Sequence, residues 1–120
     1  MSDRSGVAYR KALSLGEEQR KVNPRNANLL SYLAGYHAML GEARQAHENI
    51  GDALRLMPRD PEVLYYSGLV YAQLGEKEKA IDALQRSVAA GYSPSAVRDT
   101  PNFAALTNDP RFQALISSRR

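Results

Sequence analysis

The chain has 120 residues and a net charge of +3, with 43% hydrophobic residues, 24% charged residues and no cysteine. This is the length of a single domain that can bury a core, and the lack of cysteine excludes disulfides and thiolate metal sites. No apolar run reaches the roughly 18 residues of a membrane span, and no signal-peptide-like stretch follows Met1, so we expect a cytoplasmic protein with no membrane contact.

The first predicted element is a helix over residues 6–22. When the chain is compared with itself at an offset of 34 residues, Ala12 and Pro24 align with Ala46 and Pro58. The register is lost between those matches. We therefore interpret this helix as a degraded second helix of a helical hairpin, which caps the N-terminal end of the fold.

Residues 27–60 are predicted to form a complete helical hairpin. Asn26 is a suitable N-cap, and Gly41 stands where a helix end needs a left-handed backbone. A second helix follows and ends before Pro58, which cannot continue it. The first helix carries an apolar stripe with helical spacing, made of Leu30, Leu33, Ala34, His37 and Leu40.

Residues 61–94 repeat this pattern, with Asp60 as cap, a first helix to Leu74, a turn at Gly75 and a second helix to Ala90. Because the matches at the 34-residue offset fall at packing positions, the period marks a repeated structural unit. A single hairpin cannot cover its own apolar stripe, so the hairpins are expected to stack. The identical pairs are Leu30/Leu64, Tyr32/Tyr66, Ala38/Ala72, Leu40/Leu74, Gly41/Gly75, Glu42/Glu76 and Ala46/Ala80.

The C-terminal tail, residues 95–120, breaks the repeat. Three cap-and-proline signals, at Ser93, Thr100 and Asp109, predict short helices near 94–99, 101–106 and 109–118. We expect the tail to cover the last hairpin as a lid. Its apolar anchors are Val97, Phe103, Leu106, Phe112, Leu115 and Ile116.

These hairpins resemble the tetratricopeptide repeat family, which has 34-residue hairpins with small residues at fixed places, a glycine between the helices and a closing proline. The resemblance covers 27–94 well and 6–26 weakly. Two residues depart from it: His37 replaces the usual aromatic residue, and Tyr92 replaces the closing proline. The residues that carry it are Ala34/Gly68, Gly41/Gly75, Ala46/Ala80, Ala53/Ser87 and Pro58.

The resemblance implies an all-α fold, a right-handed superhelix of stacked helix-turn-helix hairpins that forms an α-solenoid fragment with a capping tail. The tail also resembles the ends of longer bacterial repeat arrays, so a second hypothesis makes this chain the C-terminal regulatory part of a larger signalling protein. The expected parts are a capping helix (1–26), two repeats (27–60 and 61–94) and the tail (95–120).

In this family one face of the first helix of each hairpin lines a concave, peptide-binding groove. Tyrosine offers a large surface with a polar tip, so Tyr32, Tyr65 and Tyr66 are the expected anchors, with Glu62 as one contact for a cation. The tail or a second copy of the chain could instead occupy the groove. The candidate partner-binding residues are Asn28, Ser31, Tyr32, Gly35, Met39, Glu62, Tyr65, Tyr66, Leu69 and Gln73.

The leading functional hypothesis is a scaffold, adaptor or regulatory module that binds a partly apolar, aromatic protein segment. The groove face lacks lysine and arginine, which argues against the family's chaperone-tail binding. The alternative is a homodimer formed through exposed hairpin edges, because fewer than three full repeats leave apolar ends poorly covered.

We expect neither an enzyme nor a cofactor or metal site. The two histidines, His37 and His47, lie on separate predicted helices, and a metal site would need a carboxylate such as Glu48, which the spacing does not suggest. Nucleic-acid binding is not expected either. The basic excess sits at the chain ends, while 27–94 hold six basic and eight acidic side chains.

Overall fold

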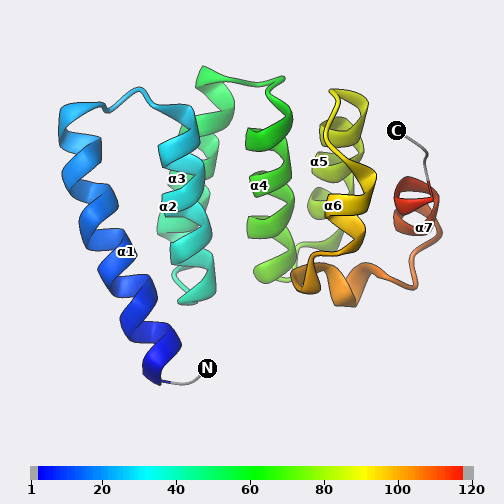
Figure 1. Cartoon of the computed structure of the whole chain (residues 1–120), viewed down its shortest axis with the longest axis horizontal. Coiled ribbons are helices and arrows are strands. Elements are labelled where there is room, and N and C mark those ends of the chain that lie inside the picture. Colours follow the sequence, from blue (N-terminus) through cyan, green and yellow to red (C-terminus); the bar gives the residue numbers. More distant parts are fainter. Residues whose placement is uncertain (1–2, 118–120) are drawn as a thin grey trace.

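Helices succeed one another along residues 3–117, the part of the chain that the computed structural model describes, with side chains from residue 6 (Figure 1). Residues 1, 2 and 118–120, which belong to the predicted terminal segments, lie outside it. The elements are α1 (Asp3–Val22), α2 (Ala27–Met39), α3 (Ala43–Leu56), α4 (Pro61–Gln73), α5 (Lys77–Ala89), α6 (Pro94–Arg98), the 3₁₀ helix η1 (Pro101–Leu106) and α7 (Pro110–Ile116).

The predicted caps and turns define the helix ends. The Asn26 side chain accepts a hydrogen bond from the Leu29 amide at 3.1 Å, and Asp60 caps α4 in the same way. Gly41 and Gly75 both adopt the left-handed backbone, with φ of 77° and 79°. The structure thus contains the predicted caps and glycine turns of two helical hairpins.

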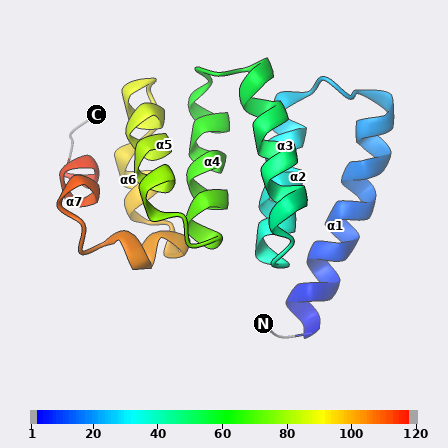
Figure 2. The same ribbon diagram turned by 180° about the vertical axis from the view of Figure 1, so that it is seen from behind.

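The helices pack in the order of the sequence. The helices α2 and α3 form one hairpin and α4 and α5 a second, with α2 against α4 between them and α1 against α2. In Figure 1, α2 and α6 lie in front of α3 and α5, and the view from behind in Figure 2 reverses this order. The helices α2 and α6 therefore lie on one side of an all-α domain, and α3 and α5 lie on the other.

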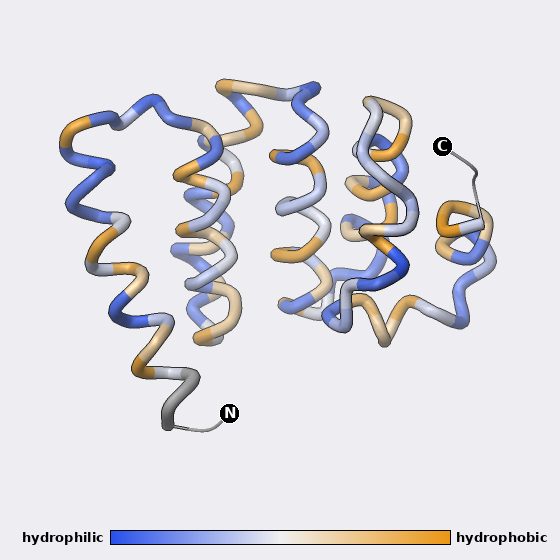
Figure 3. The backbone as a smooth tube through the Cα atoms, in the orientation of Figure 1, coloured by the Kyte–Doolittle hydropathy of each residue, from blue (hydrophilic) through white to orange (hydrophobic). Residues whose placement is uncertain are grey.

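The core consists of three adjoining clusters, since each helix presents apolar residues to its neighbours, and polar and apolar residues alternate along the helices in Figure 3. One cluster, with Ile50 and Val63, joins α2, α3 and α4. A second, with Leu84 and Phe103, joins α5 to the tail. The third, around Leu33, joins α1 to α2.

The tail is fixed to the second hairpin by apolar anchors and by one ionic cluster. Phe103 and Phe112 are fully buried in the second core cluster. The buried carboxylate of Asp109 caps α7 and accepts from the Arg111 guanidinium at 2.9 Å, with the Lys77 ammonium 3.5 Å away. These hydrogen bonds, that of Arg111 first, hold the pKa of Asp109 well below its usual range.

Two details of the tail differ from expectation. Residues 101–106 form a 3₁₀ helix, and the Thr100 hydroxyl, instead of capping it, donates back to the Ala96 carbonyl at 2.7 Å.

Among the described helices, none is long and apolar enough to cross a membrane.

Candidate partner-binding face

The exposed side of α2 and α4 carries a group of tyrosines in mutual contact. The rings of Tyr32 and Tyr66 meet edge to face with centroids 5.0 Å apart, and Tyr66 meets Tyr65 in the same way at 5.5 Å. All three are half-buried. Because α2 packs directly on α4, residues one repeat apart become neighbours, which is how Tyr32 and Tyr66 come together.

Glu62 stands beside this group and is its only predicted charged member. The Tyr32 hydroxyl donates to the Glu62 carboxylate at 2.5 Å, and this hydrogen bond, followed by burial, raises the pKa of Tyr32 to about 12. Burial and then the charge of Glu62 raise the pKa of Tyr66. The face therefore presents aromatic surface around one carboxylate.

The tail, together with Tyr92 in the segment just before it, covers part of this face. The Tyr65 ring stacks on that of Tyr92 with centroids 4.4 Å apart, and its edge-to-face contact with Phe103 is 5.9 Å. The Tyr65 hydroxyl lies 2.7 Å from that of Thr100, at hydrogen-bonding distance. Tyr65, expected as an anchor for a partner, is thus engaged by the chain itself, whereas Tyr32 and Tyr66 have no ring contact with the described residues of the tail.

The remaining predicted residues differ in exposure. Asn28 and Gln73 are exposed, and Gly35 lies against the Tyr66 ring, since a Cβ built there would be 4.0 Å from it. Ser31, however, is fully buried and donates its hydroxyl to the Ala27 carbonyl at 2.9 Å, so it does not reach the surface. A serine hydroxyl can donate its hydrogen bond to a carbonyl one turn earlier in its own helix, as Ser31 does here, and so needs no contact with solvent.

Two further predicted residues contact the tail. Leu69 packs against the second core cluster together with Tyr65. Met39, at the end of α2, has its sulfur 3.7 Å from the side-chain amide of Asn102 in η1. One side chain of the tail therefore contacts the end of α2, while η1 itself lies beside the lower end of α4 in Figure 1.

Sequence reasoning missed three tyrosines around this face. Tyr36 follows Tyr32 by one helical turn, a signal that could have found it, and its ring contacts that of Tyr9 on α1 at 6.3 Å. Tyr92 comes from the segment after α5 and could not be placed from helical spacing. The tyrosine face, as we call it below, comprises Tyr9, Tyr32, Tyr36, Tyr65, Tyr66 and Tyr92.

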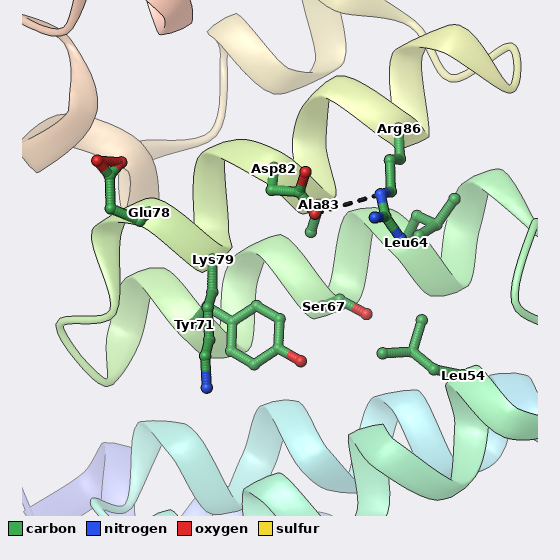
Figure 4. A pocket seen from close by; sticks show the side chains of 9 residues that line it. All are labelled: Leu54, Leu64, Ser67, Tyr71, Glu78, Lys79, Asp82, Ala83 and Arg86. Carbon is green, nitrogen blue, oxygen red and sulfur yellow. Dashed lines mark ion pairs between the residues drawn. The ribbon is translucent and has the colours of Figure 1, made fainter.

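A cleft of about 430 Å³ opens on the opposite side, between α3 and α5 (Figure 4). The Tyr71 ring lies in it, and burial raises the pKa of Tyr71. The charges around the cleft are paired, as in the 3.2 Å ion pair of Arg86 with Asp82. No sequence signal pointed to this cleft. Its lining residues are Leu54, Leu64, Ser67, Tyr71, Glu78, Lys79, Asp82, Ala83 and Arg86.

Both histidines serve as partners of a glutamate at a helix start. His37 lies 2.9 Å from Glu42, which also accepts from Arg10, and His47 lies 2.8 Å from Glu76. The hydrogen bond to His37, and then that to Arg10, lower the pKa of Glu42. Within residues 3–117, no three histidine or carboxylate side chains gather in a group that could hold a metal ion.

Comparison with protein-family models finds no match for the chain, and comparison with curated proteins finds none either.

The hydrogen bond between Tyr32 and Glu62 predicts a loss of stability at alkaline pH. Tyr32 and Tyr92 both have a folded-state pKa near 12, above the unfolded value of about 10. The stabilisation that these two protonated hydroxyls give to the folded state is therefore complete below about pH 10 and is lost as the pH rises towards about 12. We expect Tyr32→Phe to lower the free energy of unfolding at pH 8 by about 1 kcal/mol and to flatten its decline above pH 10, measured by urea unfolding.

Glu62→Gln is the matched variant for this prediction. It keeps the shape of the carboxylate but removes its charge, so the Tyr32 hydroxyl should ionise at lower pH in an absorbance titration at 295 nm. An unchanged titration curve in this variant would contradict the assignment of the raised pKa to Glu62.

Proposed function

We propose that this chain is a protein-interaction module of the tetratricopeptide-repeat type, a fragment of a right-handed superhelix with a capping helix and a capping tail. Three observations support this: the 34-residue period, the coincidence of the hairpins with that period, and the left-handed glycines at Gly41 and Gly75. In this proposal the module has no catalytic role and acts in the cytoplasm as an adaptor or regulatory unit.

The proposed binding site is the part of the tyrosine face that the tail leaves uncovered. The observation that carries the proposal is the half-buried Tyr32–Tyr66 ring pair next to the Glu62 carboxylate. Tyrosines of this kind are enriched at binding hot spots, because a rigid ring contributes contact area at little entropic cost. The partner is an apolar or aromatic peptide segment that carries a cationic side chain opposite Glu62.

The test uses a peptide selected from a random library on the wild-type protein. Tyr66→Ala should weaken its binding by about 2 kcal/mol, roughly a thirtyfold rise in Kd, measured by calorimetry, while the circular dichroism spectrum stays helical. Because Tyr66 is half-buried at the margin of the first core cluster, and not inside it, we expect the hairpin itself to be retained.

Tyr71→Ala is the matched control, since Tyr71 belongs to the same helix but lies in the cleft on the opposite side. It should leave the affinity unchanged. An equal loss of affinity in both variants would argue against the tyrosine face as the site.

A further inference from the structure

The outer side of α1 carries a narrow stripe of exposed residues. The opposite side of this helix packs on α2 through Leu13, which is buried. At about 100° per residue, the stripe residues lie within roughly 80° of one another around the helix axis. They alternate between apolar and charged along the helix: Val7, Lys11, Leu15, Glu18 and Val22.

This stripe is the most exposed apolar feature of the described chain. Val7, Leu15 and Val22 retain 67%, 59% and 87% of their accessible surface, and they are three of the four large apolar side chains that are exposed among the described residues. Single apolar residues are common on protein surfaces, but an aligned set is typical of an interaction site. Within residues 3–117, no helix packs against this side of α1, which forms the edge of the domain in Figures 1 and 2.

The order of the stripe makes it complementary to itself. If a second α1 lies antiparallel on the first, Val7 of each copy faces Val22 of the other, and Leu15 lies beside the two-fold axis. In the same register Lys11 of each copy faces Glu18 of the other, so two Lys–Glu ion pairs form across the interface. A two-fold interface needs this kind of symmetry, because the same surface must serve both copies.

A hollow of about 520 Å³ adjoins the C-terminal end of the stripe. In the antiparallel arrangement the start of the second α1 lies over this hollow, which enlarges the surface that can be covered. Its lining residues are Glu18, Gln19, Val22, Asn23, Asn26 and Leu29.

We propose that two copies of this chain associate through an antiparallel pair of α1 helices. The Tyr32–Tyr66 pair lies on α2 and α4, and Tyr9 is about 200° from Val7 around the α1 axis, so the dimer leaves the tyrosine face accessible. The proposal does not depend on the partner-binding function. Because a 20-residue helix is about 30 Å long, the interface is at the small end of specific interfaces, and we expect a dissociation constant on the order of 10 µM.

The test is sedimentation velocity on the wild type and on charge variants at about 5–500 µM protein, a range that spans about two decades around the expected dissociation constant. Lys11→Glu places two pairs of like charges in the interface, as does Glu18→Lys, and each should weaken dimerisation at least tenfold. The double variant with both substitutions reverses both charges together and should dimerise like the wild type. All these positions are exposed, so helicity should stay unchanged.

Mixing the two single variants gives the sharpest result. A Lys11→Glu chain and a Glu18→Lys chain complement each other in the antiparallel register, so the mixture should form dimers although neither variant does alone. A wild type that stays monomeric at 500 µM would overturn the proposal. Dimers insensitive to both single substitutions, or single variants that do not recover on mixing, would also overturn it.

Discussion

Phe103→Ala is expected to lower the free energy of unfolding by about 3–5 kcal/mol, the usual cost of emptying a fully buried aromatic site. Phe103 is 1% exposed and contacts both Tyr65 and Phe112 through their rings. Its loss leaves a cavity between α4, η1 and α7 that the short tail helices cannot close without moving. Chemical unfolding followed by circular dichroism measures the change.

The matched control is Asn102→Ala, one residue earlier in η1. Asn102 is exposed, and its weak contact with the Met39 sulfur is 3.7 Å long, so the change should stay within about 0.5 kcal/mol. Equal stabilities of the Phe103 variant and the wild type would mean that the tail is not packed as described. A second, separate unfolding transition would mean that the tail unfolds on its own.

Gly68→Val is expected to destabilise the protein by about 3 kcal/mol, because it overpacks the second hairpin. A Cβ atom added at Gly68 would lie 2.6 Å from Leu84 Cδ2 and 2.7 Å from its Cγ, and Leu84 is fully buried. Since the Cγ is near the backbone, the leucine cannot turn aside as a longer flexible side chain would. Thermal and urea unfolding measure the loss.

The compensating substitution Leu84→Ala distinguishes a steric clash from a general intolerance of change. Leu84→Ala alone creates a cavity and should cost about 2–5 kcal/mol. The double variant keeps the number of side-chain carbons in the pair, so its loss should be well below the sum of the two single losses. Additive losses would contradict the clash.

Gly51→Val serves as the control for the glycine change, because its nearest neighbour is the flexible end of Arg55 at 3.6 Å. It should be close to neutral. The repeat agrees with this difference. Gly68 and Leu84 correspond to the buried Ala34 and Ile50 of the first hairpin, whereas Gly51 corresponds to the exposed Gln85.

The helical hairpins could be predicted because their signals are local. A cap such as Asn26 or Asp60 and a left-handed glycine such as Gly41 act within one turn of the helix, so the residues themselves determine where a helix begins and ends. The predicted second helix of the last hairpin, from Glu76 to Ala90, differs from α5 by only one residue at each end. Differences of one residue at a helix end reflect fraying of the last turn and not a difference in packing.

The candidate site was predictable only in part, because side-chain contacts depend on the path of the tail. Helical spacing placed Tyr32 and Tyr66 on one side of α2 and α4, and the structure brings them together. Nothing in the spacing could show that Tyr92 and Phe103 would converge on Tyr65, since this contact joins residues 27 and 38 positions apart. Ser31 was expected on the partner-binding face, but close packing around α2 leaves its side chain no access to solvent.

The sequential packing of the helices has a consequence for how this chain folds. Each helix finds its main neighbours among elements that are near it in the sequence, so native contacts form by closing short loops and cost little chain entropy. A nucleus can arise in either hairpin and extend towards both ends. The same topology lets a 34-residue unit be inserted between α3 and α4 without rerouting any other part of the chain.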